Sequence, residues 1–219
     1  MTIDDARLAA AAALRDLNHA FVGHHADEPR LRELTERARV EAAALRRGER
    51  RDRLALMRAA AEAAAATTDL TGGFPPAAAG SGFSDRAVAG TTNPTSIEID
   101  VDMGVDGGDV VGRFEFGSAF EGAPGRAHGG MVAAAFDDVT GFVIGQLREP
   151  AFTGELTVRF VRPVPVREPL EMRARLDGRE RRKLFISAKA RTGDEIVATC
   201  TATYITVDPS IFAGSPDPR

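Results

Sequence analysis

Three features are scarce or missing in this 219-residue chain, and each absence narrows the class of protein. The chain has a single cysteine, Cys200, so no disulfide can form within it. It has no apolar run of about 18 residues, the length a helix needs to cross a bilayer. Its formal net charge is −4, which argues against a nucleic-acid partner. We therefore expect a globular protein that binds neither nucleic acid nor membrane.

The start of the chain, MTIDDARLAAAAALRDL, places acids ahead of an Ala-rich segment, where a secretory signal has basic residues. We therefore expect a cytoplasmic protein. The lone Cys200 alternates with Ile196, Ala198, Ala202 and Tyr204 along a predicted strand. This placement favours a packing role for the thiol over a nucleophilic one.

Composition divides the chain into four segments. Residues 1–66 are rich in Ala, Arg, Leu and Glu and predict a helical extension of two or three helices, with Asp27 as a cap. Residues 67–94 turn to Gly, Pro, Ser and Thr and predict a linker, residues 95–208 form the main domain, and 209–219 a tail. The extension is thinly apolar, so we expect six side chains to pack on the main domain or on another subunit: Leu31, Leu34, Leu45, Leu54, Leu56 and Met57.

The main domain alternates between strand and helix periodicity in an informative order. Two strand-like runs precede one long helical run, and four strand-like runs follow it. Turn signals at Asp177-Gly178 and Gly193-Asp194 separate the last three. The runs are Ser96–Met103, Val110–Phe116, a loop Gly117–Ala127, the helix His128–Arg148, and strands Phe152–Val161, Leu170–Asp177, Lys183–Arg191 and Ile196–Val207. This order predicts an α+β fold in which an antiparallel sheet wraps around one long helix.

The start of that helix, HGGMVAAAFD from His128 to Asp137, carries the most chemistry. The first N–H groups of a helix lack intrahelical acceptors and lie at the positive end of the dipole. Because Gly129 and Gly130 have no side chains, a substrate carbonyl can come close to them. The segment predicts a site that stabilises a developing oxyanion, with a carboxylate further along the helix.

These residues resemble the PaaI-like hotdog-fold acyl-CoA thioesterases, and most closely the type of thioesterase superfamily members 4 and 5. The resemblance spans about 95–207 and rests on HGG-x6-D, on FEGAPGRA before it, and on TGELTVRFVRPVP after it. It implies a hotdog fold, hydrolysis of an acyl-CoA thioester, no metal or cofactor, and a homodimer or dimer of dimers. The N-terminal extension is not covered.

The resemblance also implies roles for individual residues. Asp137 matches the catalytic carboxylate, acting as general base or as nucleophile, and Gly129 matches the residue whose N–H polarises the thioester carbonyl. His128 matches the motif histidine that orients the loop or the substrate, and Thr153 a hydroxyl that positions the carboxylate or water. Many relatives carry an Asn six residues before the motif histidine, where this chain has Gly122.

Helix geometry adds a requirement of its own. Gly129 and Asp137 are eight positions apart on one helix, which is about 12 Å at 1.5 Å per residue. They cannot flank the same carbonyl carbon within one chain, so a shared site needs Gly129 from one subunit and Asp137 from another. Asp138, adjacent to Asp137, points about 100° away around the helix. From the residues alone either aspartate suits the site, and the motif spacing selects Asp137.

Other groups are open to more than one interpretation. His19, His24 and His25 lack the ligand spacing of a metal site, so we expect surface histidines. Arg159, Arg182 and Lys183 are either ordinary solvated residues or contacts for the phosphates of CoA. Four phenylalanines are candidates both for an acyl tunnel and for the core: Phe114, Phe116, Phe120 and Phe142.

Two alternatives to a thioesterase stay open. One is a non-catalytic acyl-CoA-binding or regulatory hotdog dimer, which Gly122 keeps alive. The other is an enoyl-CoA hydratase, which needs an Asp and His pair in a segment resembling D-x-N-P-x-H. The nearest segment here, residues 91–96 (TTNPTS), has neither group, so we rank the hydratase low.

Overall fold

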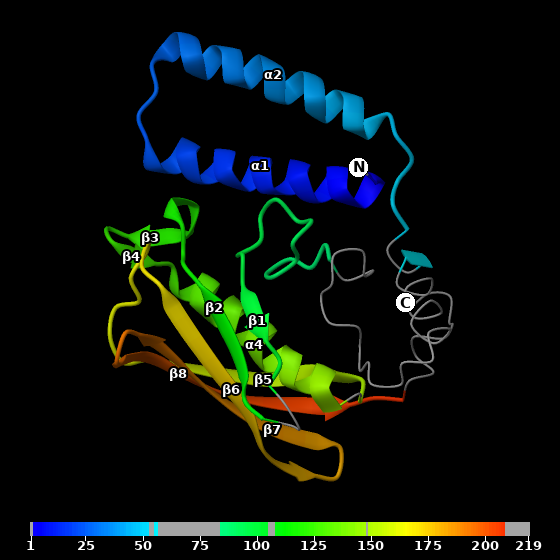
Figure 1. Cartoon of the computed structure of the whole chain (residues 1–219), viewed down its shortest axis with the longest axis vertical. Coiled ribbons are helices and arrows are strands. Elements are labelled where there is room, and N and C mark those ends of the chain that lie inside the picture. Colours follow the sequence, from blue (N-terminus) through cyan, green and yellow to red (C-terminus); the bar gives the residue numbers. More distant parts are fainter. Residues whose placement is uncertain (1, 53–54, 57–83, 105–107, 148, 209–219) are drawn as a thin grey trace.

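The computed structural model describes residues 2–52, 55–56, 84–104, 108–147 and 149–208. Two helices come first, then two strands, a short 3-10 helix and a small hairpin, then one long helix and four long strands (Figure 1). The elements are α1 (Ile3–Gly23), α2 (Glu28–Arg46), β1 (Asp100–Asp102), β2 (Val110–Phe114), η1 (Ser118–Phe120), β3 (Glu121–Ala123), β4 (Arg126–Ala127), α4 (Gly129–Leu147), β5 (Ala151–Phe160), β6 (Leu170–Glu180), β7 (Lys183–Thr192) and β8 (Glu195–Thr206).

Six strands make one antiparallel sheet in the order β1-β2-β6-β7-β8-β5, and α4 packs against it (Figure 1). Strands β3 and β4 form a separate hairpin. The helix buries the apolar stripe expected from its sequence, because Val132, Phe136, Val139 and Val143 are all at most 2% exposed. Strand β5 lies at one edge of the sheet. The predicted fold class, an antiparallel sheet wrapped around one long helix after N-terminal helices, is therefore confirmed.

One of the two predicted turns is wrong. Strand β6 runs through Asp177-Gly178 to Glu180, and the pairing with β7 shifts register between Leu176 and Gly178. A β-bulge therefore absorbs the residues expected to form the turn. The chain turns instead after Glu180, where Arg181 adopts a positive φ of 52°. The second predicted turn is confirmed, since Gly193 has φ 55° between β7 and β8.

The first predicted strand, residues 96–103, is mostly loop. Only Asp100–Asp102 pair with β2. Ser96 is instead held by a local turn, because its N–H donates to the carbonyl of Asn93 and its hydroxyl donates to the carbonyl of Gly90 at 2.7 Å. Side-chain hydrogen bonds of this kind compete with strand pairing.

The last part of the predicted linker packs on the domain. Ser84, Ala89 and Thr92 are at most 9% exposed, and Ala89 belongs to the hydrophobic core. The N–H of Ile97 donates to the carbonyl of Val88 at 2.6 Å, which closes residues 84–98 into a compact loop. The segment that was expected to separate two regions therefore carries part of the core.

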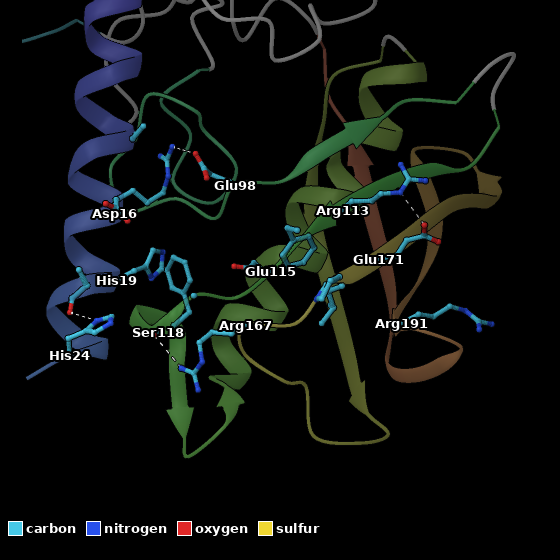
Figure 2. A pocket seen from close by; sticks show the side chains of 18 of the residues that line it. Asp16, His19, His24, Glu98, Arg113, Glu115, Ser118, Arg167, Glu171 and Arg191 are labelled. Carbon is cyan, nitrogen blue, oxygen red and sulfur yellow. Dashed lines mark hydrogen bonds and ion pairs between the residues drawn. The ribbon is translucent and has the colours of Figure 1, made fainter.

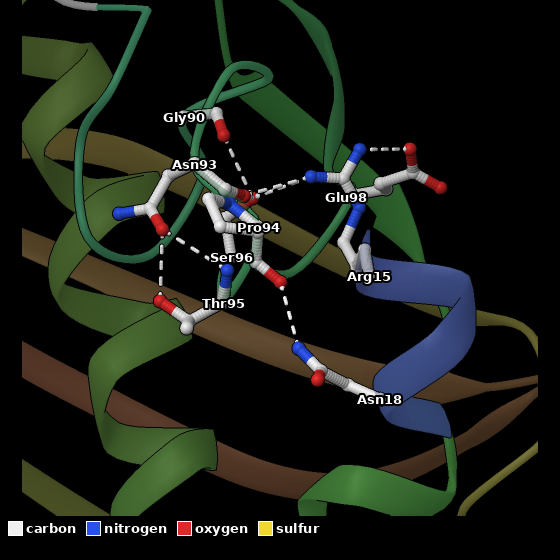
Figure 3. A network of polar contacts seen from close by, with 8 residues as sticks. All are labelled: Arg15, Asn18, Gly90, Asn93, Pro94, Thr95, Ser96 and Glu98. Atoms are coloured by element: carbon white, nitrogen blue, oxygen red, sulfur yellow. Dashed lines mark hydrogen bonds and ion pairs between the residues drawn. The ribbon is translucent and has the colours of Figure 1, made fainter. Parts of the chain in front are cut away.

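Helix α1 docks on this loop through one buried cation (Figure 3). The Arg15 guanidinium donates to the carbonyl of Asn93 at 2.8 Å and to the hydroxyl of Ser96 at 3.2 Å, and it forms an ion pair with Glu98. Asn18, one turn further, donates to the carbonyl of Pro94 at 3.2 Å. Among the helices of the described residues, none is apolar enough over sufficient length to span a bilayer.

Helix α2 has no buried residue. The expectation that its leucines pack on the main domain is wrong within one chain, because Leu31 is 38% and Leu45 77% exposed and only Leu34 is partly covered. Leu56 is 40% exposed, and Leu54 and Met57 lie outside the described residues. Packing of these leucines and of Met57 on another subunit stays a prediction.

Candidate active site

Asp137 and Thr153 lie side by side although they belong to different elements. Asp137 is half-buried in the middle of α4, and Thr153 is exposed near the start of the edge strand β5. The Thr153 hydroxyl donates to Oδ1 of Asp137 at 2.8 Å. A register shift between Thr153 and Glu155 lets this side chain face the helix at an otherwise open edge. The structure therefore brings together two of the residues predicted for catalysis.

Tyr204, on β8, holds the helix backbone at Asp137. Its hydroxyl donates to the Asp137 carbonyl at 2.9 Å and lies 2.9 Å from the hydroxyl of Thr140. Burial raises the pKa of Tyr204 to about 12, with a smaller opposing contribution from its hydrogen bonds to Thr140 and Thr153. The phenol therefore remains a hydrogen-bond donor at neutral pH. The sequence placed Tyr204 only on an apolar strand face, but a buried tyrosine hydroxyl usually needs a polar partner.

The two adjacent aspartates of α4 face different surroundings, as helix geometry predicts. Asp138 packs against the loop that precedes β1, where it accepts a hydrogen bond from the N–H of Ala89, and its Oδ2 is buried without a partner among the described residues. Burial raises the pKa of Asp138, and the nearby Arg86 opposes this shift. Asp138 therefore belongs to the loop contact, while Asp137 meets Thr153.

The HGG segment forms the beginning of α4. The His128 N–H donates to the Phe120 carbonyl at 2.8 Å, and the His128 ring nitrogen Nδ1 accepts the N–H of Gly130 at 3.1 Å. Gly129 is the first residue of the helix, so its N–H has no intrahelical acceptor. The His128 ring therefore accepts the N–H of Gly130, and the N–H of Gly129 is left as the donor suited to an oxyanion. The role of Gly130 in substrate binding stays a prediction.

Close approach explains why Gly122 departs from the family pattern. A Cβ at this position would lie 2.7 Å from Cα of His128, closer than real side chains come to a backbone atom. The Asn found in many relatives therefore cannot be accommodated here without a backbone shift. Gly122 itself has no side chain that could make the contacts of an Asn.

The predicted phosphate contacts do not form one cluster. Arg182 donates to the last carbonyl of β8, and Lys183 begins β7 opposite Ile205, which in turn lies opposite Phe152. Arg159 is seven residues further along β5 than Phe152, which is about 23 Å at 3.3 Å per residue. Within one chain the structure therefore keeps Arg159 apart from Arg182 and Lys183.

The remaining candidates have structural roles. Phe114, Phe116 and Phe142 are at most 8% exposed and belong to the core, against which Phe120 is partly buried. Burial raises the pKa of the Cys200 thiol to about 12, which agrees with a packing role. Within the described ranges, no group of three or more His, Cys, Asp or Glu side chains is placed to hold a metal ion.

A cavity of about 990 Å³ lies between α1 and the sheet (Figure 2), and Asp137 is not among its lining residues. Its arginines already have partners on the protein: Arg15 pairs with Glu98, Arg113 with Glu171, Arg167 with Glu121, and Arg191 donates to the carbonyl of Asp194. The groove therefore does not offer a set of free cations for a phosphate. The TTNPTS segment lies near this side of the molecule, where Asn93 and Ser96 serve to dock α1.

The segment from α4 to β8 is similar in sequence to known proteins. Residues 124–205 match the family model described as the thioesterase superfamily. The acyl-coenzyme A thioesterase THEM4 of Bos taurus is 35% identical over 98 residues, which are 44% of this chain and 40% of that protein. The acyl-coenzyme A thioesterase THEM5 of Homo sapiens is 40% identical over 85 residues, 37% of this chain and 33% of that protein. The matched segment thus spans well under half of either relative's length.

The fold recurs in a crystal structure of a thioesterase superfamily protein. That structure superposes with a TM-score of 0.71 at 21% identity and covers 94% of this chain and 95% of its own. The described molecule is thus a hotdog-fold protein whose N-terminal helices fall largely within the matched length. Its α4 to β8 segment matches the thioesterase superfamily model, in agreement with the resemblance stated from the HGG motif.

Proposed function

We propose that this protein hydrolyses an acyl-CoA thioester to a free acid and CoA. One observation carries the proposal: the Asp137 carboxylate, oriented by the Thr153 hydroxyl at 2.8 Å, lies on the helix that begins at Gly129, whose N–H has no intrahelical acceptor. A carboxylate and an anion-stabilising N–H are the two groups that acyl transfer to water requires. The relatives named acyl-coenzyme A thioesterase support the choice of thioester.

The site is completed by a second copy of the chain. Gly129 lies against the ring of Phe160, which is at the end of strand β5. Asp137 lies against Thr153, which is near the start of the same strand. If the edge strands of two copies pair antiparallel about a two-fold axis near the middle of β5, the start of one strand meets the end of the other. Asp137 of one chain then faces Gly129 of the partner subunit. Two equivalent sites result.

The exposed surface of β5 supports this pairing. An unpaired strand edge presents free N–H and C=O groups, and solvent-exposed apolar side chains add to the gain from covering it. Phe152 is 52% exposed, and Phe160 and Val161 are each 51% exposed. The same pairing reverses the ends of β5, so that Arg159 of the partner subunit approaches the side where Arg182 and Lys183 lie. The three cations would then serve one CoA.

In the reaction, the scissile C–S bond is replaced by a C–O bond. Thr153 holds Oδ1 of Asp137, which leaves Oδ2 to act. As general base, Oδ2 takes a proton from water, whose oxygen attacks the carbonyl carbon; as nucleophile, it forms an anhydride that water then cleaves. In both routes the Gly129 N–H of the partner subunit stabilises the oxyanion. In the general-base route Asp137 passes the proton from water to the leaving sulfur, and in the nucleophile route the thiolate takes a proton from solvent, so that CoA is released as the thiol. No step needs a metal or cofactor, so a chelator should leave turnover unchanged.

A thiol-release assay over straight-chain acyl-CoAs of increasing length tests the activity. Asp137→Asn should lower kcat by about 100- to 10,000-fold. Thr153→Val should lower it about tenfold, since one hydrogen bond is lost. Asp138→Asn is the matched control, because it removes the neighbouring carboxylate and should leave kcat within about threefold. Turnover that survives Asp137→Asn would contradict the mechanism.

Complementation tests the shared site. Gly129→Pro removes the N–H, and proline is tolerated at the first position of a helix. Mixing the inactive Gly129→Pro and Asp137→Asn chains should restore about one quarter of wild-type activity, because half of the dimers are mixed and each mixed dimer has one intact site. If each chain held a complete site, mixing would restore nothing. Light scattering on the wild type gives the oligomeric state, as a dimer or a dimer of dimers.

A non-catalytic acyl-CoA-binding dimer is the second candidate, favoured by the lack of room for an Asn at position 122. It predicts tight binding of acyl-CoA by the wild type without release of thiol. Binding can be followed by fluorescence of Tyr204, the only tyrosine in a chain without tryptophan, whose hydroxyl contacts Asp137. Thiol release by the wild type would exclude this candidate.

A further inference from the structure

His19 connects the N-terminal extension to the loop that leads into α4 (Figure 2). Its Nδ1 accepts the N–H of Ala119, within η1, at 3.1 Å. Its ring packs edge-on against Phe120, with 5.1 Å between the ring centres. The ring also fills the space above Gly117, where a Cβ would come within 2.5 Å of it. Three residues of the segment 117–120, which comprises η1 and the residue before it (the η1 segment), therefore contact one side chain from α1.

The same η1 segment supports the start of α4. The carbonyl of Phe120 accepts the N–H of His128 at 2.8 Å, and His128 in turn accepts the N–H of Gly130. Gly129 lies between these two residues. A short chain of contacts therefore runs from α1 through η1 to the N–H that the proposed mechanism uses. On the opposite side, Arg167 donates to the hydroxyl of Ser118 at 3.3 Å.

We propose that His19 is a positioning residue for the oxyanion donor Gly129. The proposal rests on the proposed function and extends it by giving the N-terminal extension a part in catalysis. Oxyanion stabilisation depends on donors held in place before reaction, and small displacements lower the rate. The Ala119 N–H needs the acceptor on His19, because an unmade hydrogen bond at a partly buried N–H is destabilising. Without His19, η1 loses the acceptor for the Ala119 N–H and the ring that packs against Phe120, and the approach of Gly23 to Ser118 still joins α1 to it.

Two substitutions separate the ring from the acceptor. His19→Phe keeps an aromatic ring against Phe120 but removes the acceptor for Ala119. His19→Asn places an amide Oδ1 close to the position of Nδ1 and removes the ring. His24→Phe is the matched control, since His24 is the C-cap of the same helix, is exposed, and its ring lies 3.2 Å from the Ala20 carbonyl of that helix.

Steady-state kinetics should show a reduced kcat with little change in KM. His19→Phe should lower kcat about tenfold, the equivalent of one lost hydrogen bond, and His19→Asn should recover most of that loss. His24→Phe should match the wild type. A role in stability alone would lower the melting temperature of both His19 variants without this ordering of kcat.

Hydrogen exchange supplies a readout that does not depend on activity. In His19→Phe, amides of residues 117–130 should exchange at least about fivefold faster than in the wild type, while those of β7 and β8 are unchanged. Unchanged exchange and unchanged kcat in both variants would overturn the proposal. If the wild type releases no thiol, the proposed function fails, and faster exchange in His19→Phe still supports the link while unchanged exchange rejects it.

Discussion

Helices α1 and α2 have similar lengths, 21 and 19 residues, yet only one of them is anchored to the domain. Both are rich in Ala and have side-chain caps, from Thr2 in α1 and Asp27 in α2, but α1 has two arginines and α2 has five. Helix α1 buries Ala11 and Arg15, whereas α2 buries nothing. Helix formation and helix docking are therefore determined by different residues.

The arginines show where the difference arises. In α2 they pair with glutamates one turn away on the same helix, as in Arg32 with Glu28 and Arg37 with Glu33, and these pairs are exposed. In α1 the Arg15 side chain is only 6% exposed and reaches residues 93–98 on the loop before β1 (Figure 3). Pairs along one helix stabilise the helix, while contacts distant in sequence fix its position.

Arg15→Ala should have the largest effect, because it removes the side chain that anchors α1 and would make α1 as loosely attached as α2. Removing this buried side chain costs about 3 kcal/mol, because the Ser96 hydroxyl loses the Arg15 donor and the space filled by the Arg15 stem is left empty, although the Asn93 carbonyl keeps its donors on Ser96. We expect α1 to detach, which urea unfolding and protease cleavage near residue 24 would detect. Because α1 carries His19, kcat should fall as well. A variant with wild-type stability and protease resistance would show that other contacts anchor α1.

A matched pair of alanines sharpens the comparison with a smaller effect. Ala11 is 4% exposed on α1, and Ala43 is exposed on α2. Leucine at position 11 overfills a packed site and should cost about 1–3 kcal/mol. Leucine at position 43 should change the free energy of unfolding by less than about 0.5 kcal/mol. Equal effects in urea unfolding would contradict the difference in docking.

Local sequence signals predicted the elements of this fold well. The α4 stripe of Val132, Phe136 and Val139 is fully buried, and Asp27 caps α2 as expected. Periodicity and caps depend on neighbours a few residues away, so one sequence suffices to find them. The turn at Asp177-Gly178 was wrong because a bulge in β6, set by pairing with β7, took its place.

The candidate site was predictable where the family motif reaches and not elsewhere. The motif spacing selected Asp137 over Asp138, and the structure places Asp137 against Thr153. Tyr204 and His19 were missed as supports of the site because their partners lie 67 and 100 residues away in the chain. Contacts at such separations follow from the tertiary fold, which no local pattern encodes. For the same reason residues 84–94 were predicted as linker.

The loop of residues 84–98, which lies under α1, leads to a prediction of how stability depends on pH. Loop 84–98, on which Arg15 docks, is tied to α4 by the Ala89 N–H and Asp138, whose pKa is raised mainly by burial. A carboxyl with a raised pKa in the folded state contributes most stability at low pH and loses it as pH rises through the folded pKa. In Asp138→Asn this contribution is absent. The stability of wild type relative to Asp138→Asn should therefore fall over the pH range that begins at about 4, the pKa of an unperturbed Asp.

Urea unfolding of both proteins across this pH range measures the difference, in which the other carboxyl groups cancel. A wild type that gains stability relative to Asp138→Asn as pH rises would show that the pKa is lowered in the fold, and that the charge of Arg86 outweighs burial.

The smallest effect belongs to α2. Arg37→Ala removes an ion pair with Glu33 in which the side chains are 67% and 45% exposed. Such pairs contribute about 0.3–0.5 kcal/mol and are screened by salt. We therefore expect a small loss of helix stability that disappears in 1 M salt, with unchanged kcat and unchanged exchange in residues 117–130. A large loss of stability from Arg37→Ala would mean that α2 is anchored in solution by a contact that the single chain does not contain. A second subunit is the direct explanation for such a contact. Dilution, which separates the subunits, would then remove the difference in stability between Arg37→Ala and the wild type.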